Sequence, residues 1–243
     1  MLQRFVSRLA FLLPIHLSLA CTSIRPTSSR GCGPDVAPVR DLEATSLHYQ
    51  GTFAVGGRTT PATSSLTVAP HPAGGWAVTE RAQLPRGVAM DSARLDAHTL
   101  APRERVIQQG VTHIALRFAV QHATGTITTG AQVHPISADL CGSLVGDGAG
   151  AFLVIGRLPL DTGYHAIFRH LDLQAAKTTV RRLSVVGSER VSVPAGSFHS
   201  WKVEISDAGS ATPSTIWVDK ATLVPVKFSA TQGTVTIAME LAR

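Results

Sequence analysis

The chain has 243 residues, of which 44% are hydrophobic and 16% are charged, and its formal net charge is +6 at pH 7. Because the basic residues are scattered and are not interleaved with aromatic residues, the composition argues against a nucleic-acid-binding protein. The part that follows the N-terminal region, roughly 200 residues, suits one all-β domain, since such domains reach this length without splitting.

The first twenty residues are typical of an export signal. Arg4 and Arg8 form a positively charged start, and the apolar run from Leu9 to Leu19 follows them. This run is too short to cross a bilayer, which takes about 20 apolar residues. We therefore expect a signal peptide over residues 1–20 and an exported protein.

Cys21 follows a stretch, Leu17-Ser18-Leu19-Ala20, that is similar to the lipobox of bacterial lipoproteins. The resemblance implies that Cys21 becomes the lipid-modified first residue, carrying diacylglycerol and palmitate. Ser18 stands where the pattern has Leu, and Ser18-x-Ala20 equally suits an ordinary secretory cleavage. Because Thr22 follows Cys21, the resemblance implies anchoring at the outer membrane on its periplasmic side; a soluble periplasmic or secreted protein is the alternative.

Residues 21–41 are rich in Ser, Thr, Pro, Gly and Arg and have no apolar periodicity, which is typical of a flexible tether. A single domain is expected over residues 42–243. If Cys21 carries lipid, Cys32 and Cys141 remain as a pair that could form a disulfide in an oxidising compartment. Two free thiols are the alternative.

Alternation of apolar and polar residues predicts antiparallel strands along most of the domain. These strands are expected at Leu47–Val55, Ser65–Ala69, Trp76–Arg81, Val88–Leu95, Gly125–Gly130, Tyr164–Leu171, Thr179–Val186, Glu189–Val193 and Ser197–Ser206. A strand with Ile114, Leu116, Phe118 and Val120 on one face is expected between the fourth and fifth of them.

The last stretch of the chain, Trp217–Leu241, matches an earlier and weaker copy, Leu95–Phe118, at a constant offset and without a gap. Both copies contain Asp-x-x-Thr-Leu-x-Pro followed by Gln-Gly. We interpret them as an internal duplication of a three-stranded antiparallel unit. Pro225 is expected at the entry of its strand, because proline cannot donate a ladder hydrogen bond.

The alternation of apolar and polar residues stops between Pro135 and Leu160, where the sequence is rich in Gly and its apolar residues follow no single face. One short helix or two helical turns are predicted around Ala138–Val145 and Gly150–Leu158, ending before Pro159. Since an apolar helix among half-exposed strands needs cover, we expect a short helical lid over the concave face of the sheet.

Three signatures resemble an uncharacterised bacterial family of exported proteins. They are Leu158-Pro159-Leu160-x-x-Gly163, Val191-x-Val193-Pro194-Ala195-Gly196-Ser197-Phe198, and Trp217-Val218-Asp219 with Leu223-x-Pro225-Val226. The resemblance covers the chain from about Leu42 onward. It implies an all-β fold with a minor helix, similar to the lipoprotein-localisation carriers: a strongly curved antiparallel sheet, or half-barrel, with helices covering its concave side. It implies no catalytic residues.

Motifs for catalysis or metal binding are weak. Asp161-Thr162-Gly163 resembles an aspartic-protease loop, but Asp207-Ala208-Gly209 lacks the hydroxyl residue that a second such loop needs, so we interpret the first as a β-turn. The ten histidines lie in no metal-binding motif and are expected to be surface or satisfied residues, with His165 and His170 on opposite faces of a strand. We expect no metal, no cofactor and no enzyme activity.

Two functions fit the pattern. One is a non-enzymatic carrier that binds a lipid or another apolar ligand against the concave face; the other is an assembly protein of the cell envelope that docks envelope proteins. A cavity and a filled core give the same alternation, so the sequence leaves both open. The apolar face that would line the cavity or form the core consists of Ile114, Leu116, Phe118, Phe152, Val203, Ile205, Ile237 and Met239.

Overall fold

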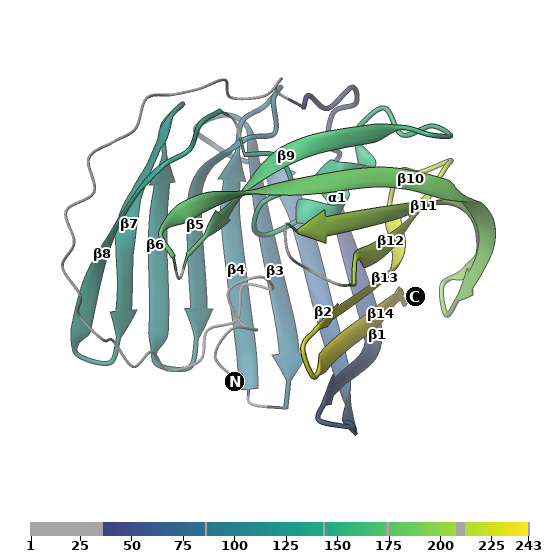
Figure 1. Ribbon diagram of the computed structural model, residues 1–243, viewed down its shortest axis with the longest axis horizontal. Helices are drawn as coiled ribbons and strands as arrows, with labels where there is room; N and C mark the ends of the chain where they lie inside the picture. The colour runs from purple at the N-terminus through teal and green to yellow at the C-terminus, as the bar shows by residue number, and fades with distance from the viewer. Residues whose placement is uncertain (1–35, 86, 143, 174, 208–211, 243) are drawn as a thin grey trace.

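The fold is seen in a computed structural model that describes residues 36–85, 87–142, 144–173, 175–207 and 212–242. These residues form fourteen strands in one antiparallel sheet, which is not closed, and one short helix (Figure 1). The predicted all-β class with a minor helix is confirmed, and the open, curved sheet is consistent with the predicted half-barrel.

The strands follow the chain as two runs separated by the helix. The first run is β1 (Thr45–Val55), β2 (Arg58–Pro70), β3 (Trp76–Leu84), β4 (Gly87–Leu95), β5 (Pro102–Gln109), β6 (Thr112–Phe118), β7 (His122–Thr129) and β8 (Gln132–Asp139). After α1 (Ala151–Gly156) come β9 (His165–Asp172), β10 (Lys177–Val193), β11 (Gly196–Asp207), β12 (Ser214–Asp219), β13 (Pro225–Gln232) and β14 (Val235–Leu241).

Strands that are neighbours in sequence pair with one another except β8 and β9, and β1 also pairs with β14. The sheet is therefore an up-and-down meander that is cut between β8 and β9, its two end strands. We name residues 140–164, which cross this cut, the connecting segment. Figure 1 shows that it carries α1 inside the curve of the sheet.

The two ends of the sheet lie close together. The Thr178 hydroxyl on β10 donates to the backbone oxygen of Asp139 on β8 at 3.4 Å. Leu144 forms an isolated parallel bridge with Arg169, whose Nε donates to the backbone oxygen of Cys141 at 3.0 Å. The connecting segment thus fastens one end of the sheet to the other.

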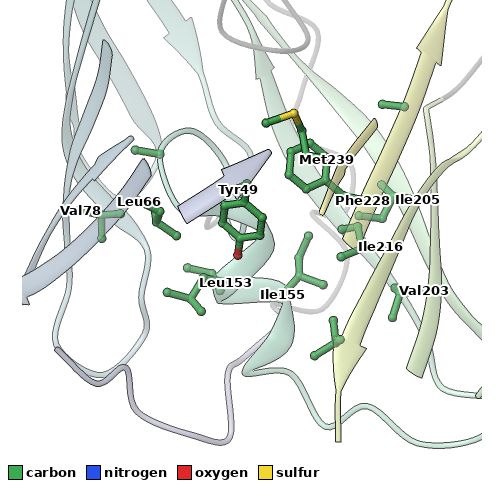
Figure 2. Packing of buried hydrophobic residues seen from close by; sticks show 14 of the residues in the cluster. Tyr49, Leu66, Val78, Leu153, Ile155, Val203, Ile205, Ile216, Phe228 and Met239 are labelled. Atoms are coloured by element: carbon green, nitrogen blue, oxygen red, sulfur yellow. The ribbon is translucent and has the colours of Figure 1, made fainter. Parts of the chain in front are cut away.

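The larger hydrophobic cluster joins α1 to both arms of the sheet. Leu153 and Ile155 of α1 are buried with Leu66 of β2 on one side and with Val203 and Ile216 on the other (Figure 2). Barrels of about eight strands are filled by their own side chains, whereas wider ones leave space inside. In this wide, curved sheet the side chains of the strands do not fill the interior, and the apolar side chains of α1 fill part of the remaining space.

A second cluster lies under the β5–β8 arm. Ile114, Leu116 and Phe118 belong to it, together with Leu144 of the connecting segment and Leu171 of β9. The connecting segment therefore contributes to both clusters.

Three details of the predicted elements were wrong. The helical structure expected around Ala138–Val145 is absent from its described residues: β8 continues to Asp139, with Ile136 and Ala138 buried at a period of two, and Leu144 forms an isolated bridge. Val120 lies beyond the end of β6 and is 74% exposed. The two strands expected at 179–186 and 189–193 form one strand, β10, because a β-bulge between Val185 and Gly187 absorbs the irregularity.

The two copies of the proposed duplication share local geometry. β5 begins at Pro102 and β13 at Pro225, which confirms the expected strand-entry position of Pro225. Leu100 and Leu223 both have a positive φ, of 53° and 59°. The carboxylates of Asp96 and Asp219 each accept from the amide three residues later, at 2.9 Å in both cases. These features agree with a duplication, which stays a prediction.

Residues 1–35 lie outside the described residues, and with them the predicted signal peptide, Cys21 and Cys32. Cys141 is disulfide-bonded, and its predicted pairing with Cys32 stays a prediction. From residue 36 the chain lies on the domain: the Val39 amide donates to the Arg157 carbonyl at 2.9 Å, and Leu42 is buried. In the described part of the chain no helix is long and apolar enough to cross a bilayer.

Candidate ligand-binding site

A cavity of about 120 Å³ lies between the concave face of the sheet and the connecting segment. One wall is apolar and includes Tyr49, Leu84, Phe152, Phe228 and Met239. The charged part of the lining, which we name the charged end, consists of Glu80, Asp91, Arg105, Asp147 and His170. The cavity is therefore amphipathic, with the aromatic wall contributed by β1, α1 and β13.

Three rings form the centre of the apolar wall. Phe228 packs edge-on against Tyr49, with ring centroids 5.9 Å apart, and in a tilted arrangement against Phe152, with centroids 5.0 Å apart. The Tyr49 hydroxyl donates to the Pro225 carbonyl at 2.9 Å. Burial, and to a smaller extent the charge of Glu80, raises the pKa of Tyr49 well above its usual value, so it stays neutral. Figure 2 shows Tyr49, Phe228 and Met239 next to α1.

Arg105 is the buried cation at the charged end, where it is only 4% exposed. Its Nη2 donates to Asp91 Oδ2 at 2.7 Å, its Nε to Asp91 Oδ1 at 3.1 Å, and its Nη1 to Asp147 Oδ1 at 3.3 Å. Burial alone would lower the pKa of Arg105, but Asp91 and Asp147 together raise it above its usual value. The guanidinium is therefore permanently charged, and each of its three nitrogens donates to one of two carboxylates.

Asp147 brings the connecting segment to the sheet. Its Oδ2 accepts the Leu171 amide of β9 at 2.8 Å, while its Oδ1 contacts Arg105. Burial would raise the pKa of Asp147, but His170, Arg105 and the Leu171 amide hold it well below its usual range. The next residue, Gly148, has φ +89°, and an added Cβ would lie 2.6 Å from Arg105 Nε. Only glycine allows the backbone this close to the guanidinium.

His170 is 6% exposed and borders the same cavity. Its Nδ1 lies 3.2 Å from Asp147 Oδ1, which is close enough for an ion pair but is not aligned for a hydrogen bond. Its Nε2 is buried and has no hydrogen-bond partner among the described residues. A buried polar atom of this kind ordinarily has a partner, so a ligand or water atom is expected beside Nε2.

Glu80 faces Asp91 directly across β3 and β4. Burial, followed by the negative charge of Asp91, raises the pKa of Glu80 to about 7, although the Gly150 amide and Arg105 favour the ionised form. Glu80 is surrounded by protein but remains partly exposed, because it borders the cavity. Since its pKa is raised above 4.5, its ionisation opposes folding, and this loss of stability develops as pH rises through about 4.5 to 7.

The residues expected to form the apolar face are divided among three places. Phe152, Ile237 and Met239 line the cavity. Val203 and Ile205 lie in the larger cluster away from it, and Ile114, Leu116 and Phe118 lie in the second cluster. Phe118 also lines another hollow, of about 180 Å³, whose lining includes none of the buried charged residues.

The weaker motifs lie elsewhere. Asp161 is in an exposed turn, where its carboxylate accepts the Thr162 amide at 2.6 Å and Gly163 has a positive φ. His165 is exposed whereas His170 is buried, as their opposite faces require. Within the described residues no group of three or more His, Cys, Asp or Glu side chains is arranged to hold a metal ion.

Sequence reasoning missed the charged end. The signal was present, because Asp91 lies between Ala89 and Ala93, at the buried positions of an alternating strand. Glu80 likewise lies between Val78 and Ala82. A charge at an inward-facing strand position is costly unless it is paired, and so it marks a site of interest. The charges meet only because particular strands pair with one another, and the sequence pattern does not show which strands pair.

The fold and cavity define an all-β, barrel-like domain that is open at one seam. The chain belongs to the DUF3108 family, described as proteins of unknown function, which matches residues 46–241. This confirms the predicted resemblance to an uncharacterised family. No curated protein matches the chain.

Two solved structures are similar to the chain. One is a β-barrel-like protein of the domain of unknown function DUF1849 from Brucella abortus; it has 8% identity and a TM-score of 0.55, and the match covers 86% of this chain and 98% of that one. It supports the barrel-like fold. The other, inferred to be an exported protein with a YmcC-like fold, is from Bacteroides fragilis; it has 10% identity and a TM-score of 0.32, with 86% and 99% of the two chains covered.

Proposed function

We propose that this protein is a non-enzymatic binding module that holds a lipid or another apolar ligand in the cavity between the sheet and α1. The observation that carries the proposal is the cavity itself, whose lining combines an aromatic wall with buried polar atoms. Ligand sites are typically concave and mostly apolar, with a few polar groups that fix orientation. The unpartnered Nε2 of His170 supports a ligand at the charged end.

The volume limits what enters the cavity as it stands. About 120 Å³ is below the roughly 300 Å³ at which ordinary ligand pockets begin, and is similar to an engineered cavity of about 150 Å³ that binds benzene. The cavity therefore takes a ring-sized or short-chain apolar body. A complete lipid chain would require Phe152 and α1 to move away from Phe228.

We further propose that the protein is exported and anchored through Cys21 to the outer membrane, facing the periplasm. The lipobox-like stretch before Cys21 and the tether-like composition of residues 21–41 support this arrangement. A lipid anchor of this kind would hold the domain near a source of apolar ligands, since each buried CH₂ contributes about 0.8 kcal/mol to membrane binding.

An assembly protein of the cell envelope is the second candidate. It is favoured by Val133 on β8 and Ile167 on β9, which are 60% and 53% exposed on the two end strands of the sheet. Apolar side chains on an end strand suit the addition of a partner's strand. In this case the cavity would be empty in the cell.

Mass spectrometry of protein extracted from its own envelope tests ligand and anchor together. The denatured mass should show a chain that begins at Cys21 and carries acyl groups, and the native mass should show an additional non-covalent ligand. Replacing Cys21 by Ala should release the protein into the soluble fraction, whereas Cys32→Ala should leave it with the membrane. Sedimentation of Cys21→Ala with membranes at high salt would remove the lipid anchor, and a ligand-free native mass would favour the assembly protein.

A further inference from the structure

We propose that the charged end of the cavity recognises a primary ammonium group, so that the ligand is a cationic amine with a short apolar body. This inference rests on the proposed binding function and names the chemical class of the ligand. It follows from the way in which the charges at this end pair with one another, and from the one carboxyl group that is left over.

At this end two carboxylates share one cation, Arg105, and Glu80 adds a third carboxyl group. Asp91 and Asp147 both contact Arg105, at 2.7 and 3.3 Å. Arg181, which also borders the cavity, pairs with Asp207 at 2.6 Å. Among the described residues Glu80 takes part in no ion pair, although it borders the cavity. An ammonium group beside Glu80 would supply the missing positive charge.

An anionic head group fits this end poorly. Arg105 is already paired with two carboxylates, since Nε and Nη2 donate to Asp91 and Nη1 donates to Asp147, so its single positive charge is more than neutralised. A carboxylate or phosphate would instead meet the negative charges of Glu80, Asp91 and Asp147. Repulsion of this kind discriminates between ligands as effectively as attraction does.

His170 provides a second point of recognition. Asp147 lies 3.2 Å from Nδ1, which favours the tautomer with its proton on that nitrogen. In this tautomer Nε2 is a hydrogen-bond acceptor, and it is buried beside the cavity without a partner in the described chain. An ammonium group has three N–H donors, enough for Glu80 and Nε2, which border the same cavity, whereas a carboxylate has none.

Binding of an ammonium ligand should be coupled to the loss of a proton from Glu80. The pKa of Glu80 is raised to about 7, so about 10% of Glu80 is ionised at pH 6 and about 90% at pH 8. An alkylammonium keeps its charge over this range, as a lysine side chain does. Binding should therefore strengthen as pH rises. The titratable and charged groups around Glu80 are Tyr49 of β1, Asp91 of β4, Arg105 of β5, Asp147 of the connecting segment, His170 of β9 and Arg181 of β10.

Calorimetric titration with hexylammonium, hexanol and hexanoate separates the head group from the apolar body. We expect hexylammonium to bind at least about tenfold more tightly than hexanoate at pH 8, and its affinity to rise about tenfold from pH 6 to pH 8. Glu80→Gln, which imitates the protonated acid and keeps His170, should remove this pH dependence. Glu104→Gln, at a half-exposed carboxylate on β5, should preserve it.

The outcomes distinguish this inference from the proposed function. If hexanol and hexanoate bind as well as hexylammonium at pH 8, the ammonium site is overturned and the apolar cavity stands. A pH dependence that persists in Glu80→Gln would also overturn it. If none of the three binds the wild-type protein, the inference and the binding function both fail. The comparison of ligands needs only the wild-type protein, so it holds even if a variant does not fold.

Discussion

Replacing Arg105 by Met is expected to lower the free energy of unfolding by about 3–5 kcal/mol. The change removes the cation that Asp91 and Asp147 share and leaves two buried carboxylates without their main partner. The methionine chain fills much of the same space, so the loss reflects charge more than packing. Because a domain of this kind is stable by about 5–15 kcal/mol, the change should clearly lower the urea concentration at the midpoint of unfolding, followed by circular dichroism.

Two further variants show whether the buried charge is the cause. Arg94→Met removes an exposed ion pair between the same two strands, in which Arg94 lies 3.2 Å from Glu104, and should cost less than about 1 kcal/mol. Adding Asp91→Asn and Asp147→Asn to Arg105→Met should restore part of the loss, because no unpaired charge remains. If Arg94→Met and Arg105→Met cost the same, the network does not stabilise the fold as we describe.

Ile155→Ala is expected to cost about 2–5 kcal/mol, whereas Phe152→Ala on the same helix should cost less than the roughly 3–5 kcal/mol of a buried aromatic. Ile155 is 2% exposed and packs in the larger cluster away from the cavity lining, while Phe152 is half-buried and borders the cavity. Removing Phe152 enlarges a space that already exists, and truncating Ile155 creates a new one. Thermal unfolding of both variants measures the difference. If Phe152→Ala lowers the free energy of unfolding by as much as the loss of an aromatic ring from a filled core, the space beside Phe152 is packed and is not an open cavity.

Much of the fold was predictable from periodicity. The alternation of Val235, Ile237 and Met239, and the turn at Gly233, predicted strands that the structure contains. The short helix before Pro159 was predictable because its residues are apolar on every side. The connection after β8 was harder to predict, since a glycine-rich apolar sequence is compatible with either a helix or an extended chain. The conformation of Leu144 depends on a bridge to Arg169, which lies on a strand that comes later in the chain.

The candidate site was less predictable, because it depends on which strands become neighbours. Asp91 and Arg105 are fourteen residues apart and meet because β4 and β5 pair. Asp147 and His170 reach them only through the cut in the sheet, where the connecting segment turns inward. No local pattern encodes that approach. A charge among buried alternating positions, such as Glu80, was the one signal available in the sequence.

The central claim is that the cavity binds an apolar body, and ¹⁹F NMR of fluorobenzene tests it most directly, because this neutral ring matches a cavity of about 120 Å³. The wild-type protein should shift or broaden the resonance in a saturable way. Ala82→Phe, which points a ring into the cavity, should abolish the effect, and Arg81→Phe, one residue away on the outer face, should preserve it. No change with the wild-type protein, or equal binding by Ala82→Phe, would contradict the claim.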